Sequence, residues 1–222
     1  MLHVHEFLRR HWYNVGLLAG ATGLGFALLG DLSRVQQILL LNFVVLIIHE
    51  FEEYGWPGGE PWIMNEVLRN SDRPDRYPLN QNNALIINVF CAYPAYLLAV
   101  FFPTTVWLGL APVIFGFGQF IAHGIVTNMK LKGFYNPGLG SVVLGHFPIG
   151  IWYLVEVYAR GMISYRDWVL AVISVAAFAA IIMQWFGFTV LVDRNSPYPF
   201  APEEIVRFDR QRRLARIRRK LQ

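Results

Sequence analysis

Charged residues are scarce in this chain of 222 residues, and cysteine is almost absent. Asp, Glu, Lys and Arg make up 15% of the sequence, whereas soluble domains carry about 25%. The single cysteine, Cys91, excludes a disulfide bond within the chain. Long stretches lack charge altogether, which excludes an ordinary soluble domain and indicates a protein that crosses a membrane several times. These stretches cover residues 11–30, 35–49, 77–129, 133–155 and 168–192.

The uncharged stretches predict an all-α membrane protein with six spans. A spanning helix needs roughly 20 apolar residues, and stretch 77–129 is long enough for two helices joined by a turn at Phe102-Pro103-Thr104-Thr105. In the second span only residues 35–49 are uncharged before Glu50. A helix that crosses must therefore continue to about residue 54. The expected spans cover residues 12–30, 35–54, 84–102, 106–128, 140–158 and 168–192.

The distribution of basic residues predicts the orientation. With six spans both termini lie on one side, together with the loops after the second and fourth spans. Sixteen of the 19 Lys and Arg residues fall on that side, and only Arg34, Arg160 and Arg166 fall on the other. By the positive-inside rule the first side is cytoplasmic. We therefore expect a multi-pass protein of the cell membrane with both termini in the cytoplasm.

A histidine and two glutamates lie together at the end of the second span. The segment reads His49-Glu50-Phe51-Glu52-Glu53. On a helix with 100° per residue, Glu52 lies about 60° to one side of His49 and Glu53 about 40° to the other. Ionisable groups inside a membrane segment are costly and are candidates for functional residues. This narrow face is the best indication of a functional site in the chain.

Spans two to five carry further polar side chains toward the same end. Asn42 lies seven residues before His49, and Gln119 and His123 follow each other at a spacing of four on the fourth span. Scattered polar residues have no reason to share one depth in the membrane, so we expect them to support a common site. The expected supporting residues are Asn42, Asn83, Asn88, Gln119, Asn128 and His146.

Two imidazoles and one carboxylate are a common ligand set for catalytic zinc, with a fourth position open to water. We therefore predict that His49, Glu53 and His123 bind a divalent metal, with zinc as the first candidate. Glu52 then remains as a general base or bridges to a second metal. A di-iron carboxylate centre is an alternative, although such bundles use Glu-x-x-His, the reverse of the order here. Hydrogen bonding between helices without any metal is a further alternative.

The motif His49-Glu50-Phe51-Glu52-Glu53 matches the pattern His-x-x-Glu-Glu, and the chain resembles the HXXEE family of small multi-span membrane proteins. That family has a second pattern, Asn-x-x-x-His, where this chain reads Gln119-Phe-Ile-Ala-His123. The stretch Tyr135-Asn136-Pro137-Gly138 also resembles a Tyr-x-Pro-Gly stretch of the family. The resemblance covers roughly residues 35–155. It implies a site at these motifs and no established reaction.

Two segments outside the spans have features of their own. Loop 55–83 is long for a connection, and Pro61 followed by apolar residues predicts a short amphipathic helix, either a lid over the site or an interfacial anchor. The tail, residues 201–222, predicts a basic amphipathic helix with seven arginines and one lysine. We expect the tail to lie on anionic lipid and not on nucleic acid, with RNA binding as the alternative.

These features predict one transmembrane domain over residues 1–200, with the polar site within 35–155, followed by the tail. The leading hypothesis is a membrane-embedded, metal-dependent enzyme, hydrolytic, that acts on a lipid or amphipathic substrate. One alternative is a carrier for protons or a divalent metal that uses the same residues. A carrier needs polar residues that continue to the far side, where Glu156 is the sole charged candidate. The other alternative is a non-catalytic structural or partner-binding membrane protein. The oligomeric state has no signature in the sequence.

Overall fold

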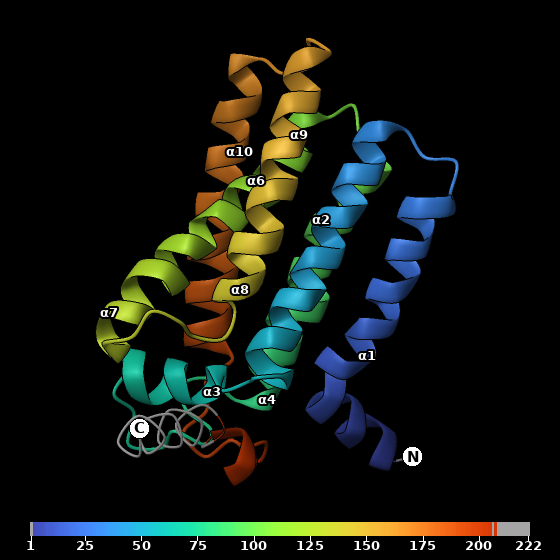
Figure 1. Cartoon of the computed structure of the whole chain (residues 1–222). Helices are drawn as coiled ribbons and strands as arrows, with labels where there is room; N and C mark the ends of the chain where they lie inside the picture. The colour runs from blue at the N-terminus through green and yellow to red at the C-terminus, as the bar shows by residue number, and fades with distance from the viewer. Residues whose placement is uncertain (1, 206, 208–222) are drawn as a thin grey trace, which may run out of the picture.

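A computed structural model describes residues 2–205 and 207, and every regular element in this part of the chain is a helix (Figure 1). Six of its helical segments are long and apolar enough to cross a membrane, which confirms the predicted fold class and number of spans. The predicted basic helix of the tail lies almost wholly outside the described residues. The spans are Val4–Leu29, Arg34–Gly55, Gln81–Phe101, Val106–Leu131, Leu139–Ala159 and Tyr165–Val190.

Most spans are made of an α-helix joined end to end with a π-helix, here labelled η. The first span belongs to α1 (Leu2–Leu29), and the second joins α2 (Arg34–Glu50) to η1 (Phe51–Gly55). The third comprises α4 (Gln81–Leu85), η3 (Ile86–Ala92) and α5 (Tyr93–Phe101), and the fourth comprises α6 (Val106–Gln119), η4 (Phe120–Thr127) and α7 (Asn128–Leu131). The fifth comprises α8 (Leu139–Ser141), η5 (Val142–His146) and α9 (Phe147–Ala159), and the sixth comprises α10 (Tyr165–Ala177) and η6 (Phe178–Val190).

Polar caps determine where several of these helices begin. A capping box starts each of α2, α4 and α10, in which the N-cap residue and the residue three positions later bond to each other's backbone amide. The N-cap residues are Ser33, Asn80 and Ser164. A side-chain oxygen at this position accepts from an amide that has no partner inside the helix. The first span starts earlier than predicted because α1 continues through Arg9 and Arg10. A kink at His11 marks the place where the predicted span began.

The π-helical segments change which side chains share a face. In η1 the amide of Trp56 donates to the carbonyl of Phe51, five residues earlier, over 2.9 Å. Such a turn is wider than that of an α-helix and often occurs at functional sites. Segments η1, η4 and η5 contain the predicted site residues Glu52, Glu53, His123 and His146. The angles of an ideal α-helix therefore do not apply beyond Glu50.

The second span lies at the centre of the bundle, and the sixth lies at its edge. In the second span 67% of the most apolar window is buried, against 6% in the sixth. Figure 1 shows α2 between α1 on one side and α9 on the other. Tyr153 on α9 is fully buried, and its hydroxyl donates to the carbonyl of Val106 over 2.9 Å. The predicted site residues on the second span are thus surrounded by protein.

The loop between the second and third spans covers one end of the bundle. It contains α3 (Glu60–Trp62) and η2 (Ile63–Leu68), which confirms the predicted short helix. Ile63 is fully buried and packs against Leu131 at the end of the fourth span. The side-chain Nδ2 of Asn65 donates to the carbonyls of Pro74 and Leu79, both over 2.8 Å, and holds the loop in place. We call this end of the bundle, which also holds the N-terminus, the site end (Figure 1).

Reporter fusions test the predicted orientation. A reporter fused after Gln222 is expected to lie in the cytoplasm, and one inserted between Ala159 and Tyr165 is expected outside, because the positive-inside rule assigns most basic residues to the cytoplasm. Paired reporters that are active on opposite sides of the membrane measure this directly. The same compartment for both positions would contradict six membrane crossings.

Candidate metal centre

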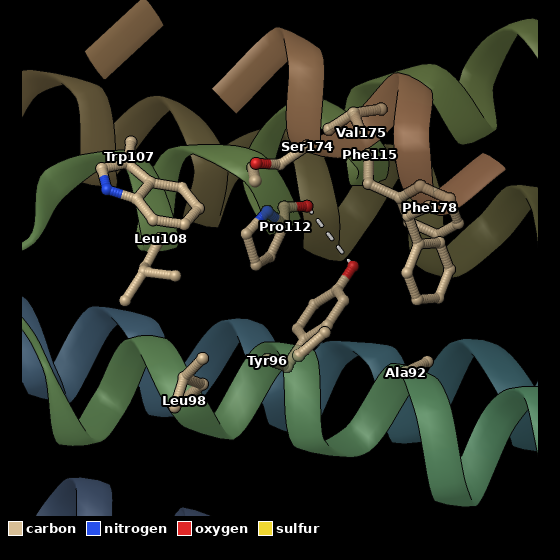
Figure 2. A pocket seen from close by; sticks show the side chains of 12 residues that line it. Ala92, Tyr96, Leu98, Trp107, Leu108, Pro112, Phe115, Ser174, Val175 and Phe178 are labelled. Atoms are coloured by element: carbon tan, nitrogen blue, oxygen red, sulfur yellow. Dashed lines mark hydrogen bonds between the residues drawn. The ribbon is translucent and has the colours of Figure 1, made fainter. Parts of the chain in front are cut away.

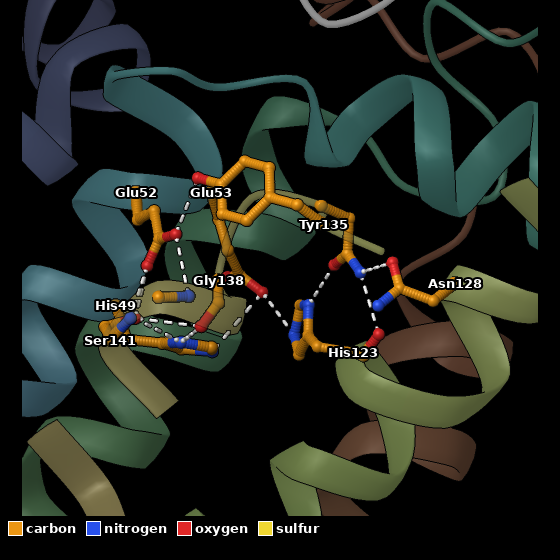
Figure 3. A network of polar contacts seen from close by, with 10 residues as sticks. His49, Glu52, Glu53, His123, Asn128, Tyr135, Gly138 and Ser141 are labelled. Atoms are coloured by element: carbon orange, nitrogen blue, oxygen red, sulfur yellow. Dashed lines mark hydrogen bonds and ion pairs between the residues drawn. The ribbon is translucent and has the colours of Figure 1, made fainter. Parts of the chain in front are cut away.

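His49 lies at the last turn of α2 and is 2% exposed. Its Nδ1 lies 3.1 Å from the carbonyl oxygen of Gly138 and 3.0 Å from Oγ of Ser141 (Figure 3). A carbonyl oxygen only accepts, so Nδ1 carries the hydrogen. A neutral His49 therefore presents an unprotonated Nε2, which is the tautomer that binds a metal through this atom.

His123 in η4 is held in the same tautomer by different groups. Its Nδ1 lies 2.7 Å from Oδ1 of Asn136. The Nδ2 of Asn136 donates to the His123 carbonyl and to Oδ1 of Asn128, over 2.7 and 2.8 Å. Both donor hydrogens of this amide are thus engaged, and its oxygen accepts from the imidazole. Asn136 is fully buried, so the orientation of the His123 ring is firmly determined.

Glu53 lies between the two imidazoles. Its Oε1 is 3.4 Å from Nε2 of His49 and 3.1 Å from Nε2 of His123. One ligand atom from each residue lies within 4.8 Å of the others. Ligands about 2.0–2.2 Å from a tetrahedral ion lie roughly 3.3–3.6 Å apart. The three side chains therefore have the types and nearly the spacing needed to hold one metal ion.

The hydrogen bonds at Nδ1 have an electrostatic consequence at this centre. With both imidazoles neutral, two nitrogen lone pairs and a carboxylate oxygen face one another in a buried space. Electron-rich atoms repel each other at this distance unless a cation or a proton lies between them. Among the described residues Nε2 of His49 has no hydrogen-bond partner, although it is close to Glu53. A metal ion satisfies all three atoms at once.

Glu52 points away from this centre and binds the first turn of the fifth span and the segment just before it. Its Oε1 accepts from the Tyr135 hydroxyl over 2.8 Å and from the Gly140 amide over 3.0 Å. Its Oε2 accepts from both the amide and the hydroxyl of Ser141, over 2.7 and 2.6 Å. The Ser141 hydroxyl in turn lies against Nδ1 of His49. Glu52 thus reaches His49 through Ser141, in the manner of carboxylates that orient metal-binding histidines.

Gly138 brings the backbone against both histidines. Its φ is +99°, a conformation that favours glycine. A Cβ at this position would lie 2.6 Å from Cε1 of His123 and 2.9 Å from Cε1 of His49. Glycine therefore allows the turn to approach close enough for its carbonyl to accept from His49.

A cavity of about 160 Å³ opens beside the three candidate ligands. Glu60, from α3, lines this cavity, and its Oε2 is buried without a hydrogen-bond partner in the described part of the chain. Burial, together with the nearby Glu53 carboxylate, raises the pKa of Glu60 to about 8. Glu50 also lines the cavity and accepts from the Tyr93 hydroxyl over 2.6 Å. Two carboxyl groups beyond the candidate ligands therefore face the same space.

The residues predicted to support the site lie at different distances from it. Asn88 and Gln119 line the cavity, and Asn128 acts through Asn136. Asn42 and His146 pair with each other, Oδ1 to Nδ1, over 3.2 Å, and the rings of His146 and His49 are 5.7 Å apart.

Asn83, by contrast, is not brought to the cavity. It completes the capping box of α4, and its Nδ2 donates to the carbonyl of Pro78 over 2.8 Å.

Sequence reasoning had not assigned a role to Glu60, Glu50, Ser141 or Asn136. Glu60 lies in a loop where a charged residue is ordinary, so its sequence position holds no signal. Asn136 had a weak signal, because it lies inside the Tyr-x-Pro-Gly stretch. Glu50 had the clearest signal, since it is a charged residue within a membrane span.

Comparison with known proteins agrees with the motifs. A family model described as "Protein of unknown function with HXXEE motif" matches residues 40–153, just over half of the chain. This range contains His49, Glu53 and His123, together with the 135–141 segment that bonds to the two histidines. No curated protein and no solved structure matches the chain. The chain belongs to the HXXEE family.

Proposed function

We propose that this protein is a metal-dependent membrane enzyme that hydrolyses an amphipathic substrate. The observation that carries the proposal is the convergence of His49, Glu53 and His123, with both imidazoles held in the tautomer that leaves Nε2 free. A divalent metal supplies Lewis acidity and lowers the pKa of water in an open coordination position. Zinc suits two nitrogens and one carboxylate oxygen.

The surrounding residues divide into those that position the ligands and those that face the substrate. Gly138, Ser141 and Asn136 hold the two imidazoles by hydrogen bonds at Nδ1. The prediction that Glu52 is the general base has weaker support, because its carboxylate already accepts four hydrogen bonds and acts on His49 through Ser141. On the cavity wall, Glu60 has a buried oxygen that finds no hydrogen-bond partner in the part of the chain that the structure describes. We assign proton transfer to Glu60 and positioning to Glu52.

The loop that contains Glu60 is positioned to act as a lid over the cavity. Glu60, Met64 and Leu68 all line the cavity, so α3 and η2 form one of its walls. The side chain of Lys130, at the end of the fourth span, donates to the carbonyl of Leu68 over 3.4 Å. Displacement of this loop would open the cavity from the site end. A lid excludes bulk water from the reacting groups and strengthens electrostatic interactions there.

The polar residues support an enzyme better than a carrier. A carrier for protons or metal needs polar groups through the whole depth of the membrane. Here the cavity next to the polar one, between the third, fourth and sixth spans, is lined mostly by apolar side chains. Glu156, the charged residue that the sequence singles out toward the far end, forms an ion pair with Arg160 over 2.5 Å.

Metal analysis of the purified protein tests the proposal. The chain, purified with a tag that contains no histidine, is expected to retain a divalent metal, and His49→Ala is expected to lose it because one of three ligands is gone. His5→Ala, an exposed histidine of α1, is the matched control and should keep the metal. A wild-type chain that neither retains metal nor takes up added zinc would contradict the proposal.

A further inference from the structure

A second cavity lies between the third, fourth and sixth spans, with a volume of about 270 Å³ (Figure 2). Most of its lining is hydrocarbon, from alanine, leucine, valine, proline and phenylalanine side chains. Tyr96, Trp107 and Ser174 are the polar exceptions among the lining residues. The Tyr96 hydroxyl is already engaged, because it donates to the carbonyl of Pro112 over 3.3 Å. This cavity suits a ligand without polar atoms.

The apolar cavity adjoins the cavity at the candidate metal centre, and the two share one wall. Ala92, Phe115 and Phe178 line both. From this shared wall the polar cavity extends toward the site end, where it reaches Leu68 and Thr127. The apolar cavity extends the other way, to Leu98 and Trp107 near the far ends of their spans. Polar and apolar sections thus follow each other along the membrane normal.

The position of the apolar cavity gives it access to lipid. One wall of the cavity is formed by the sixth span, which is the least buried of the six. Leu98 on the cavity wall is 44% exposed at the surface of the bundle, and the spans around it are long and apolar enough to lie in lipid. A hydrocarbon chain can therefore reach the cavity from the side. An extended chain with its polar end at the site end would follow the direction of the lipids around it.

We propose that the apolar cavity holds one hydrocarbon chain of the substrate, whose polar end lies at the candidate metal centre. This inference rests on the proposed function. The volume is slightly below the range of roughly 300–1,000 Å³ for small-molecule pockets, so the cavity suits a single chain and not a two-chain lipid. A chain gains little by leaving lipid for an equally apolar wall. The cavity therefore contributes position, by aligning the polar end with the metal, more than affinity.

Photochemical labelling tests this assignment. The probe is a single-chain fatty acid with a diazirine in the middle of its chain, added to the purified full-length protein in lipid nanodiscs. We expect adducts on residues that line this cavity and not the polar one, such as Leu108 and Val175. Ala95→Phe on the third span and Ala111→Phe on the fourth should each abolish these adducts, because a phenyl ring occupies the space. Ala176→Phe is the matched control, since Ala176 is exposed on the sixth span and does not line the cavity.

Metal content is measured on the same samples, so that the two proposals fail separately. Adducts confined to lipid-facing residues, or unchanged in both blocking variants, would overturn the chain assignment while bound metal left the proposed function intact. Adducts inside the cavity of a protein that never binds metal would overturn the claim that the chain belongs to a substrate, together with the proposed function. The two blocking variants enter the cavity from different spans, so either one serves if the other does not fold.

Discussion

Glu53→Gln is expected to abolish retention of the metal by the purified protein. Glu53 is the charged member of the ligand set, and its Oε1 lies 3.4 and 3.1 Å from the two imidazole nitrogens. A neutral amide oxygen is a poorer ligand for a divalent cation, and the NH₂ group of Gln can donate to the unprotonated Nε2 atoms that would otherwise bind the metal. Metal analysis and a zinc titration of the wild type and the variant measure the loss.

Two neighbouring carboxylates provide matched controls for this experiment. Glu52→Gln should weaken metal binding by roughly 10- to 100-fold, the usual cost of an altered group that orients a ligand. Glu60→Gln should leave metal content unchanged, because Glu60 lies on the cavity wall outside the ligand group. If Glu53→Gln keeps the full metal content, Glu53 is not a ligand, and the proposed hydrolase is wrong even though the residues meet. A greater loss in Glu52→Gln than in Glu53→Gln would exchange their roles.

Gly138→Ala is expected to destroy the centre by displacing both histidines. The new Cβ would lie within 3 Å of ring atoms of His123 and His49. The substitution also places a side chain at a φ of +99°, which costs about 1–3 kcal/mol by itself. We expect a lower thermal stability and loss of bound metal, measured on the same purified protein.

Gly161→Ala separates these two effects. Gly161 also has a positive φ, +61°, but a Cβ there would have nothing within 4 Å. This control should lose some stability through backbone strain and keep its metal. Gly138→Ala with full metal content would show that the 138 turn does not hold the two imidazoles in place.

The sequence by itself determined the architecture of this protein. Charge-free stretches of the length of a bilayer predicted six spans, and the structure confirms them within a few residues except at the start of the first. The reason is that backbone N–H and C=O groups in hydrocarbon must be hydrogen-bonded within the protein, and a helix bonds them within a single stretch. The pairing of His49 with Glu53 also followed from local spacing, since residues four apart meet on one face.

Only the tertiary structure decided how the two acids of the motif divide their roles. In an ideal α-helix Glu52 and Glu53 flank His49 almost equally. The π-helical turn and the 135–141 segment direct Glu52 to Ser141 and leave Glu53 between the imidazoles.

The loop residues that contribute to the site could also not be predicted from the sequence. Asn136 binds His123 from 13 residues further along the chain, and Gly138 binds His49 from 89 residues further on. Such contacts depend on how helices pack and on which backbone approaches closest, and neither has a local period in the sequence. Glu60 reaches the cavity because α3 folds back over the end of the bundle. Its Oε2, which has no hydrogen-bond partner among the described residues, becomes unusual only once that fold has buried it.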